Sequence, residues 1–103
     1  MKEHEIMQRI LISIGSRPDV RVWRNNTGAV KTQDGRIVTF GLKGSADIIG
    51  LLRGGRFLAI EVKSEIGRQS EQQKNFQKMI ESFGGLYILA RCVEDVTGRL
   101  GHE

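Results

Sequence analysis

The first pattern along the chain is a helical repeat of apolar residues over residues 3–15. Its apolar positions recur three or four residues apart: Ile6, Met7, Ile10, Leu11 and Ile14. At about 100° per residue, the apolar stripe centres near the angular position of Glu3, whereas Glu5 projects to the solvated side. The pattern predicts an amphipathic helix with a carboxylate on its apolar face. This acid either reaches water from the first turn, where acids are favourable, or serves a site.

The second helical repeat follows Ser70, a residue that is typical of a helix N-cap. Its apolar face is formed by four residues: Phe76, Met79, Ile80 and Phe83. Ser70 and Gln73 also fit a capping box, in which a glutamine at the third helical position caps the start backwards. A reach from the helix start toward a site is the alternative role for Gln73, and the pattern alone favours the cap.

Shorter apolar and alternating segments between and after the helices predict strands. They cover residues 20–24, 29–32, 36–40, 47–52, 57–63 and 86–90. Asp34-Gly35 is a strong hairpin signal between the second and third of these strands, and Trp23, the only tryptophan, is expected in the core. The tail from Val93 predicts at most a short helix. The order is helix, strand, hairpin, two strands, helix and strand, which predicts an α/β fold with a sheet flanked by helices.

Size, charge and residue usage narrow the classes of protein that fit. We expect residues 1–103 to form one domain with a modest core. Basic residues exceed acidic ones by 16 − 12 = 4, which fits a polyanionic partner without proving one. The single cysteine, Cys92, excludes an intramolecular disulfide, and His4 and His102 lie too far apart in the sequence to predict a metal site. Without a membrane-length apolar stretch or a signal-peptide pattern, we expect a soluble intracellular protein.

Charged residues flank two neighbouring apolar segments. Asp47 begins one segment, and Glu61 and Lys63 end the next, with Gly54-Gly55 between them. Buried unpaired charge is expensive, so packing alone does not explain these residues. For Glu61 and Lys63 alone, which share one face of a strand, an ion pair at a solvated strand end is the simpler interpretation. Asp47 changes that interpretation if the two segments form a hairpin.

Loop length decides whether the two acids of this hairpin share a face. A two-residue loop, Gly54-Gly55, sets Asp47 opposite Val62 and turns Glu61 to the other face. A three-residue loop, Arg53–Gly55, instead sets Asp47 opposite Glu61, with their Cβ atoms roughly 4.5–5.5 Å apart. Two carboxylates at that separation are unfavourable unless they share a metal. We therefore predict an odd-numbered loop, such as Arg53–Gly55, or a bulge at this turn.

Carboxylate ligands in this arrangement favour a hard divalent cation, Mg²⁺ or Mn²⁺. In this hypothesis Asp47 and Glu61 each supply one oxygen, the Val62 carbonyl is the third ligand, and water completes the shell. The cation would polarise a phosphate and lower the pKa of a bound water. Lys63 would orient that water or stabilise charge that develops on the phosphate. The combination suits phosphodiester hydrolysis.

Basic and amide side chains near turns and strand ends are candidate phosphate contacts, because such groups bind phosphates without reading sequence. Residues of this kind are Arg24, Asn25, Asn26, Arg36, Lys43, Arg53, Arg56 and Arg68. Each one singly is more simply explained as a solvated surface residue. As candidate DNA contacts we take Arg24, Asn26, Arg36, Lys43 and Arg68.

The chain resembles the VRR-NUC domain, a branch of the PD-(D/E)XK nuclease superfamily, in the order of its acids, its lysine and its glutamine along the sequence. The resemblance covers nearly the whole chain. It is carried by Glu3 and Ile6, Trp23–Asn26 with Gly28, Phe40–Gly50, Arg56–Lys63, Gly67-Arg68, Gln73-Lys74 and Phe76. Any one of these motifs is weak, whereas the set in this order is quite specific. Ser45-Ala46 precedes Asp47 where the first motif has a proline, a departure that is common in the superfamily.

The resemblance implies a restriction-endonuclease-like core, in which helices flank a central mixed sheet and an extra hairpin is added. It implies that Asp47 and Glu61 are metal ligands and that Lys63 is the catalytic lysine. Glu3 would be the acid of the first helix, and Gln73 the glutamine at the start of the later helix. The resemblance thus favours an active-site role for both of these residues.

Stand-alone domains of this kind are similar to phage and bacterial nucleases that act as homodimers and resemble Holliday-junction resolvases. We therefore expect a DNA endonuclease that uses Mg²⁺ or Mn²⁺ and cuts branched DNA, such as four-way junctions, as a homodimer. A two-fold dimer would match a two-fold junction. The expected location is the cytoplasm of a bacterium or of a phage-infected cell. A nicking or restriction-like nuclease on duplex DNA and a non-catalytic DNA-binding module are the alternatives.

Overall fold

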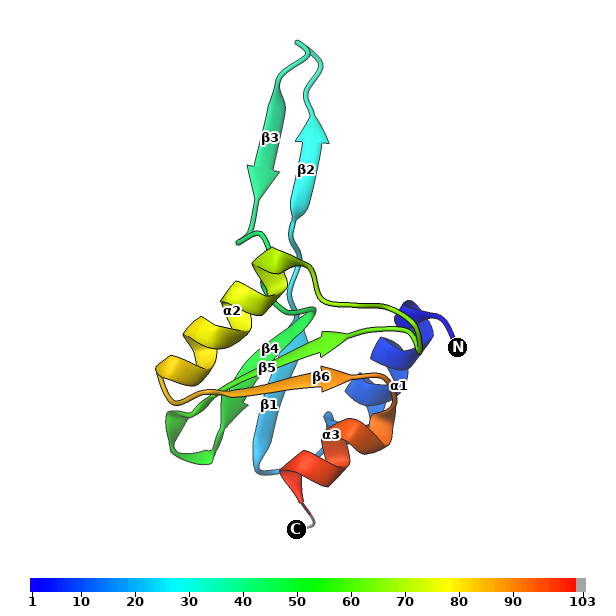
Figure 1. Ribbon diagram of the computed structural model, residues 1–103, viewed down its shortest axis with the longest axis vertical. Helices are drawn as coiled ribbons and strands as arrows, with labels where there is room; N and C mark the ends of the chain where they lie inside the picture. Colours follow the sequence, from blue (N-terminus) through cyan, green and yellow to red (C-terminus); the bar gives the residue numbers. More distant parts are fainter. Residues whose placement is uncertain (102–103) are drawn as a thin grey trace.

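A four-stranded sheet with helices on both faces forms the body of the molecule (Figure 1). The computed structural model describes residues 1–101, so His102 lies outside the described part. The elements in chain order are α1 (Glu3–Ile14), β1 (Val20–Arg24), β2 (Gly28–Lys31), β3 (Ile37–Phe40), β4 (Ile48–Leu52), η1 (Arg53–Gly55), β5 (Phe57–Val62), α2 (Glu71–Ser82), β6 (Leu86–Ala90) and α3 (Val93–Leu100). Within the described residues, no helix combines the length and the apolar character that a membrane crossing requires.

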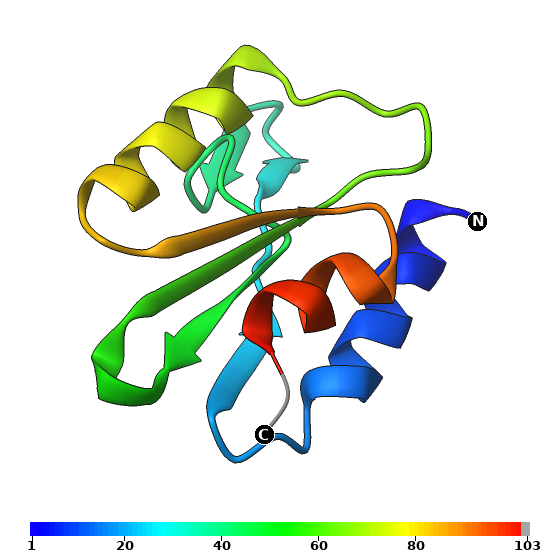
Figure 2. The same ribbon diagram turned by 60° about the horizontal axis from the view of Figure 1, so that its bottom comes forward.

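The strands of the main sheet lie in the order β1-β4-β5-β6. β4 pairs antiparallel with both β1 and β5, whereas β5 and β6 run parallel and are joined through α2. Figure 2 shows α1 and α3 on one side of the sheet and α2 on the other. A mixed central sheet flanked by helices confirms the predicted fold class, and the weakly patterned tail forms α3.

Two apolar clusters hold these layers together. The larger lies between α1, α3 and the sheet, where Ile10, Ile14 and Val96 are fully buried. The smaller lies under α2, where Phe76 and Tyr87 make an edge-to-face contact with ring centroids 6.3 Å apart. The helical repeats predicted α1 and α2 because apolar residues at helical spacing face these clusters, Ile6, Ile10 and Ile14 from α1 and Phe76 and Ile80 from α2.

The strands β2 and β3 form a separate two-stranded hairpin that projects from the body (Figure 1), and we call residues 28–40 the arm. Its pairing confirms the hairpin predicted from Asp34-Gly35. Every residue of the two strands is exposed. Val30 pairs directly with Val38, and Phe40 lies two positions along the same strand, so all three share one face. The arm therefore carries an apolar face that the described part of the chain leaves about half exposed.

Three apolar side chains that were predicted to be internal are exposed instead: Trp23, Met79 and Phe83. Trp23 is 50% exposed, because β1 is an edge strand and Val20 and Val22 occupy its core-facing positions. Trp23 therefore points to the other face of the sheet, where α2 packs against β6 at the far edge. Phe83 is 85% exposed because α2 ends at Ser82, before this residue can join the buried stripe. The core predictions for Trp23, Met79 and Phe83 were wrong.

Candidate functional site

The connection between β4 and β5 sets the register of the two strands that carry the predicted acids. It is the three-residue turn η1, in which Gly54 and Gly55 both take positive φ. The Leu52 N–H donates to the Arg56 carbonyl (2.8 Å), and Ile48 pairs with Ile60. The predicted three-residue loop is confirmed. One further step in this register brings Asp47 level with Glu61.

Asp47 lies directly before β4 and is fixed by hydrogen bonds to two other segments. Its Oδ2 atom accepts from the Val62 N–H of β5 (2.8 Å), and its main-chain carbonyl accepts from the Asn25 N–H (2.8 Å). The first of these bonds holds the carboxylate against the end of β5. The side chain is half-buried, so it is fixed on one side and open to a ligand on the other.

Glu61 is the only charged residue in the buried core of the described chain, at 3% exposed. Its Oε2 atom accepts from Gln73 Nε2 (3.1 Å) and lies 3.7 Å from Lys63 Nζ. Its Oε1 atom is buried and has no hydrogen-bond partner within residues 1–101. Burial and, after it, the negative charge of Asp47 raise the pKa of Glu61 to about 8, and Lys63 opposes the shift.

The chemistry of these carboxylates fits a divalent cation. A buried carboxylate oxygen without a partner is costly unless an added group satisfies it. The neighbouring Asp47 contributes a second negative charge, which makes a cation a better match than a neutral donor. No group of three or more His, Cys, Asp or Glu side chains in the described chain could hold a metal. A cation would therefore need main-chain or water oxygens besides Asp47 and Glu61.

Gln73 combines the two roles that the sequence left as alternatives. Its Oε1 atom accepts from the Ser70 N–H (2.8 Å), and Ser70 Oγ accepts from the Gln73 N–H (3.2 Å). This is the complete capping box, so the predicted cap of α2 is confirmed. The remaining amide group, Nε2, donates to Glu61. The start of α2 therefore fixes the orientation of the buried acid.

Glu3 lies at the edge of this site, at the first residue of α1. Its side chain is exposed, and its Oε2 atom accepts from the Ser64 N–H (3.2 Å), just after Lys63. Glu5 is exposed and lies 3.9 Å from Arg9, as expected for a solvated acid. The buried residues of α1, Ile6, Met7, Ile10 and Ile14, are centred on the angular position of Glu3, as predicted, and Glu3 itself is exposed because it lies in the first turn.

A cleft of about 200 Å³ opens beside Asp47. Its lining residues are Glu3, His4, Met7, Arg24, Asp47 and Val62. Among the predicted DNA contacts, Arg24 lines this cleft together with Asp47. Sequence reasoning had no ground for placing His4 here, because a lone histidine near the N-terminus has no motif partner. The cleft is therefore bordered by both acidic and basic groups.

The other predicted DNA contacts lie farther along the surface. Asn26 and Lys43 are exposed and flank the root of the arm, whereas Arg68 is exposed on the loop between β5 and α2. Arg36 lies at the tip of the arm and forms an ion pair with Asp34 (3.0 Å). These four residues are exposed to solvent but do not line the cleft beside Asp47.

Asn25 and Arg91 support the site in ways that sequence reasoning missed. Asn25 Nδ2 donates to Ser45 Oγ (2.7 Å) and to the Ala46 carbonyl (2.9 Å), so the segment before Asp47 is bound to the end of β1. Arg91 donates through one guanidinium nitrogen to three carbonyls of residues 64–67. Asn25 stood inside a recognised motif but was treated as a surface amide. Arg91 gave no signal, because its contacts are remote in sequence.

The raised pKa of Glu61 predicts that stability depends on pH in the absence of divalent cations. The folded chain keeps a proton up to pH about 8, whereas the unfolded chain releases it near the ordinary pKa of 4.5. The free energy of unfolding should therefore fall as the pH rises through this window, by roughly 5 kcal/mol at most. Urea unfolding in chelator at either end of the window measures the fall.

Glu61→Gln removes the titrating group and should therefore flatten this pH dependence. Glu5→Gln is the matched control, because the Glu5 side chain is exposed on α1. It should show the same fall as the wild-type chain. An equal fall in wild type and in Glu61→Gln would assign the pH dependence to other groups.

Comparison with known protein families gives an independent result for most of the chain. The family model described as the VRR-NUC domain matches residues 5–94. The match runs from α1 into α3 and includes Asp47, Glu61 and Lys63, whereas Glu3 lies just outside it. The comparison with curated proteins found no match.

Proposed function

The chain belongs to the VRR-NUC family and is a nuclease domain, and from this premise we propose that it is a metal-dependent DNA endonuclease that cuts branched DNA as a homodimer. The observation that carries the proposal is the buried Glu61 carboxylate, with one unpartnered oxygen, beside Asp47 and Lys63. A buried acid in this state is unfavourable in the chain alone and favourable next to a cation.

In this proposal Asp47, Glu61 and the Val62 carbonyl hold Mg²⁺ or Mn²⁺. When bound, the ion supplies Lewis-acid polarisation of the scissile phosphate and a lower pKa for a coordinated water. Gln73 keeps Glu61 oriented through the 3.1 Å hydrogen bond from the start of α2. Val62 keeps Asp47 oriented through its N–H group. The chain thus preorganises both carboxylates before a ligand arrives.

Lys63 is proposed as the group that stabilises negative charge during cleavage. Its side chain is only 13% exposed and its Nζ atom lies 3.7 Å from Glu61 Oε2, so the ammonium is held at the site. A fixed ammonium can orient the attacking water or lower the energy of charge that develops on phosphate. Glu3, which binds the segment after Lys63, is proposed to complete the site at its open edge.

DNA would enter along the basic and amide groups around the cleft. Arg24 lines the cleft with Asp47, and it is proposed to contact the phosphate next to the scissile bond. Asn26 and Lys43 lie at the root of the arm, while Arg68 lies on the loop between β5 and α2. We propose that these residues, with Arg36 at the arm tip, contact phosphates farther along the substrate.

Homodimer formation is proposed because a branched substrate needs two cuts and this chain carries one candidate site. The apolar face of the arm, formed by Val30, Val38 and Phe40, is about half exposed. An isolated two-stranded hairpin is only marginally stable, so cover from a second copy would stabilise the arm. Light scattering after size exclusion tests this part: a mass of two chains supports it, and a monomer at all concentrations contradicts it.

A cleavage assay on matched substrates tests the proposed activity. Synthetic four-way junctions, flaps and plain duplexes of one sequence are incubated with Mg²⁺, Mn²⁺ or chelator. The proposal expects cleavage that requires a divalent cation and prefers the junction. Equal cutting of plain duplex would favour a nicking or restriction-like nuclease. Binding without cleavage in either metal would favour a non-catalytic DNA-binding module.

Asn25 is proposed as a positioning residue for Asp47, and its loss should weaken the site without removing a ligand. Asn25→Ala removes both side-chain bonds to the segment before Asp47, at Ser45 and Ala46. We expect cleavage and cation affinity to fall about 10-fold or more, as for other groups that orient metal ligands. Single-turnover cleavage and calorimetric titration with MnCl₂ measure the two effects.

Asn75→Ala is the matched control for this variant, since it makes the same change at an exposed position of α2. It should leave cleavage and cation affinity as in the wild type. If Asn25→Ala lowers only the melting temperature and keeps wild-type cation affinity, Asn25 has a purely structural role.

A further inference from the structure

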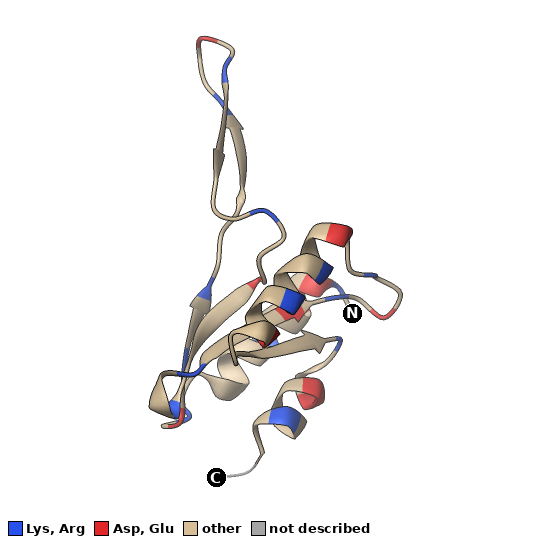
Figure 3. Cartoon of the chain, turned by 60° about the vertical axis from the view of Figure 1, so that its left-hand side comes forward, with Lys and Arg blue, Asp and Glu red and all other residues tan. Residues whose placement is uncertain are grey.

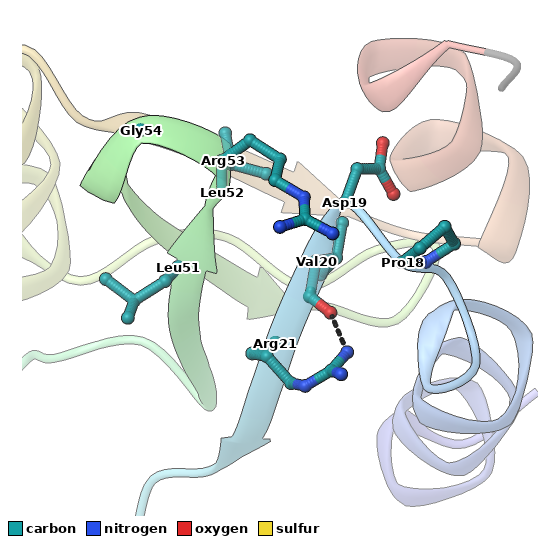
Figure 4. A pocket seen from close by; sticks show the side chains of 8 residues that line it. All are labelled: Pro18, Asp19, Val20, Arg21, Leu51, Leu52, Arg53 and Gly54. Carbon is teal, nitrogen blue, oxygen red and sulfur yellow. Dashed lines mark hydrogen bonds between the residues drawn. The ribbon is translucent and has the colours of Figure 1, made fainter.

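Two adjoining clefts lie at the end of the sheet opposite to the candidate site. The first, of about 280 Å³, lies between the start of β1 and the η1 turn, and Figure 4 shows Arg21 and Arg53 at its border. The second, of about 300 Å³, continues past Arg53 and reaches Arg56 and Arg99. Asp19, Leu52 and Arg53 line both clefts, so they form one continuous surface feature. We call it the arginine cleft.

The charge of the arginine cleft is almost entirely positive. Its four lining arginines form no ion pair with a carboxylate of the described chain: Arg21, Arg53, Arg56 and Arg99. The one lining carboxylate, Asp19, accepts two hydrogen bonds of 2.9 Å from Arg17 and is thereby neutralised. Figure 3 shows basic segments gathered around the η1 turn. The cleft therefore concentrates positive charge that nothing in the described chain balances.

Some of these guanidinium groups are held in place by the fold. Arg56 Nε donates to the Gly84 carbonyl (2.8 Å), and Arg21 donates to the Val20 carbonyl (3.0 Å), the bond drawn in Figure 4. Each of these groups uses only part of its five N–H donors on the protein. The remaining donors are therefore available to oxygen atoms of a ligand. A planar guanidinium matches the paired oxygens of a phosphate better than a lysine does.

The arginine cleft is separate from the cleft beside Asp47. The two share no lining residue, and β4 spans the distance between them, from Asp47 before its first residue to Arg53 after its last. Six residue steps at about 3.3 Å correspond to roughly 20 Å. On a DNA strand with about 3.4 Å between successive phosphates along the axis, this separation corresponds to about six base pairs.

We infer that the arginine cleft is a second DNA-contact site, which binds the sugar–phosphate backbone of a substrate arm about six base pairs from the cleaved bond. The inference rests on the proposed function, because it assigns the polyanion to the DNA substrate. Four arginines spread over two clefts suit a row of phosphates better than one small anion. The apolar side chains of Leu51, Leu52 and Leu86 suit contacts with the deoxyribose rings between phosphates.

The double variant Arg53→Ala/Arg99→Ala tests the inference. Neither side chain makes a hydrogen bond or ion pair with the described chain, so the fold should be unaffected. Binding of a labelled four-way junction is measured in chelator over a range of KCl concentrations. The affinity should fall about tenfold, and the slope of log K against log [KCl] should become shallower by about 0.9 for each phosphate that the variant no longer neutralises.

Arg9→Ala/Lys78→Ala is the matched control, since it removes two exposed charges elsewhere, on α1 and α2. It should change affinity by less than about twofold and leave the slope intact. Junction arms cut to about four base pairs should bind wild type and Arg53→Ala/Arg99→Ala equally, because they end before the arginine cleft.

The outcomes separate this inference from the proposed function. The inference alone is overturned if the wild-type chain cleaves the junction while the double variant binds it with the same affinity and salt dependence as the control variant. An effect of the double variant that persists on the short arms also overturns it. A wild-type chain that neither binds nor cleaves DNA overturns both the inference and the proposed function.

Discussion

Glu61→Gln is expected to lower the cleavage rate by at least about 10³-fold while the chain stays folded, because a metal-held transition state loses several kcal/mol of charge stabilisation. The change replaces one carboxylate oxygen by an amide group of almost the same shape. The hydrogen bond from Gln73 can still form, and the cost of a buried charge disappears. Single-turnover cleavage of a four-way junction in Mn²⁺ measures the loss.

A loss of catalysis in Glu61→Gln has to be separated from a loss of folding or of DNA binding. We expect Glu61→Gln to melt at or above the wild-type temperature in chelator, and to bind DNA at least as tightly because a negative charge is removed. Glu5→Gln, the same change at an exposed acid, should cleave normally. Cleavage by Glu61→Gln within about tenfold of wild type would remove this acid from the mechanism.

Lys63→Ala is expected to lower the cleavage rate about 10²- to 10³-fold, the effect of losing one preorganised group that stabilises developing charge. The ammonium lies 3.7 Å from Glu61 Oε2 and is largely shielded from water, so no other basic group replaces it directly. Unlike the acid variants, Lys63→Ala should keep cation binding, because lysine is not a ligand in this account. Cleavage rate and MnCl₂ titration on the same preparation measure both.

Lys78→Ala provides the matched control for Lys63→Ala, since Lys78 is exposed on α2 and lies outside the site. It should cleave at the wild-type rate. A Lys63→Ala chain that loses cation binding together with cleavage would show a role in holding the site together. A chain that keeps nearly full activity would exclude Lys63 from catalysis.

The register of the β4–β5 pair was predictable from the sequence. Its two acids, which have no role in packing, can serve one site only if the loop length places them on the same face of the sheet. Asp47 and Glu61 share a face only with an odd-numbered loop, and η1 provides it. The strands and helices followed from apolar periodicity, since each buried stripe faces a single apolar cluster. These features depend on residues near one another in sequence, where local rules are strongest.

Gln73 makes both of the contacts that the sequence left as alternatives. A glutamine has an acceptor and a donor at the end of one side chain, so it can cap a helix with Oε1 and bind an acid with Nε2. The sequence identified each role separately. Only the packing of α2 against the sheet shows that the same side chain performs both.

The features that sequence reasoning missed depend on contacts between distant segments. Trp23 was placed in the core from its residue type, but edge position and the face covered by α2 decide its exposure. Asn25 and Arg91 bind main-chain carbonyls of segments far from them in sequence. No pattern marks such contacts, because a carbonyl is present at every residue.

Calorimetric titration of MnCl₂ into the metal-free chain tests most directly whether Asp47 and Glu61 together form a cation site. The account predicts binding to the wild-type chain and at least about 100-fold weaker binding to both Asp47→Asn and Glu61→Gln, with Asn75→Ala unchanged. Wild-type affinity in both acid variants would contradict the account, because the buried carboxylates would then serve no cation.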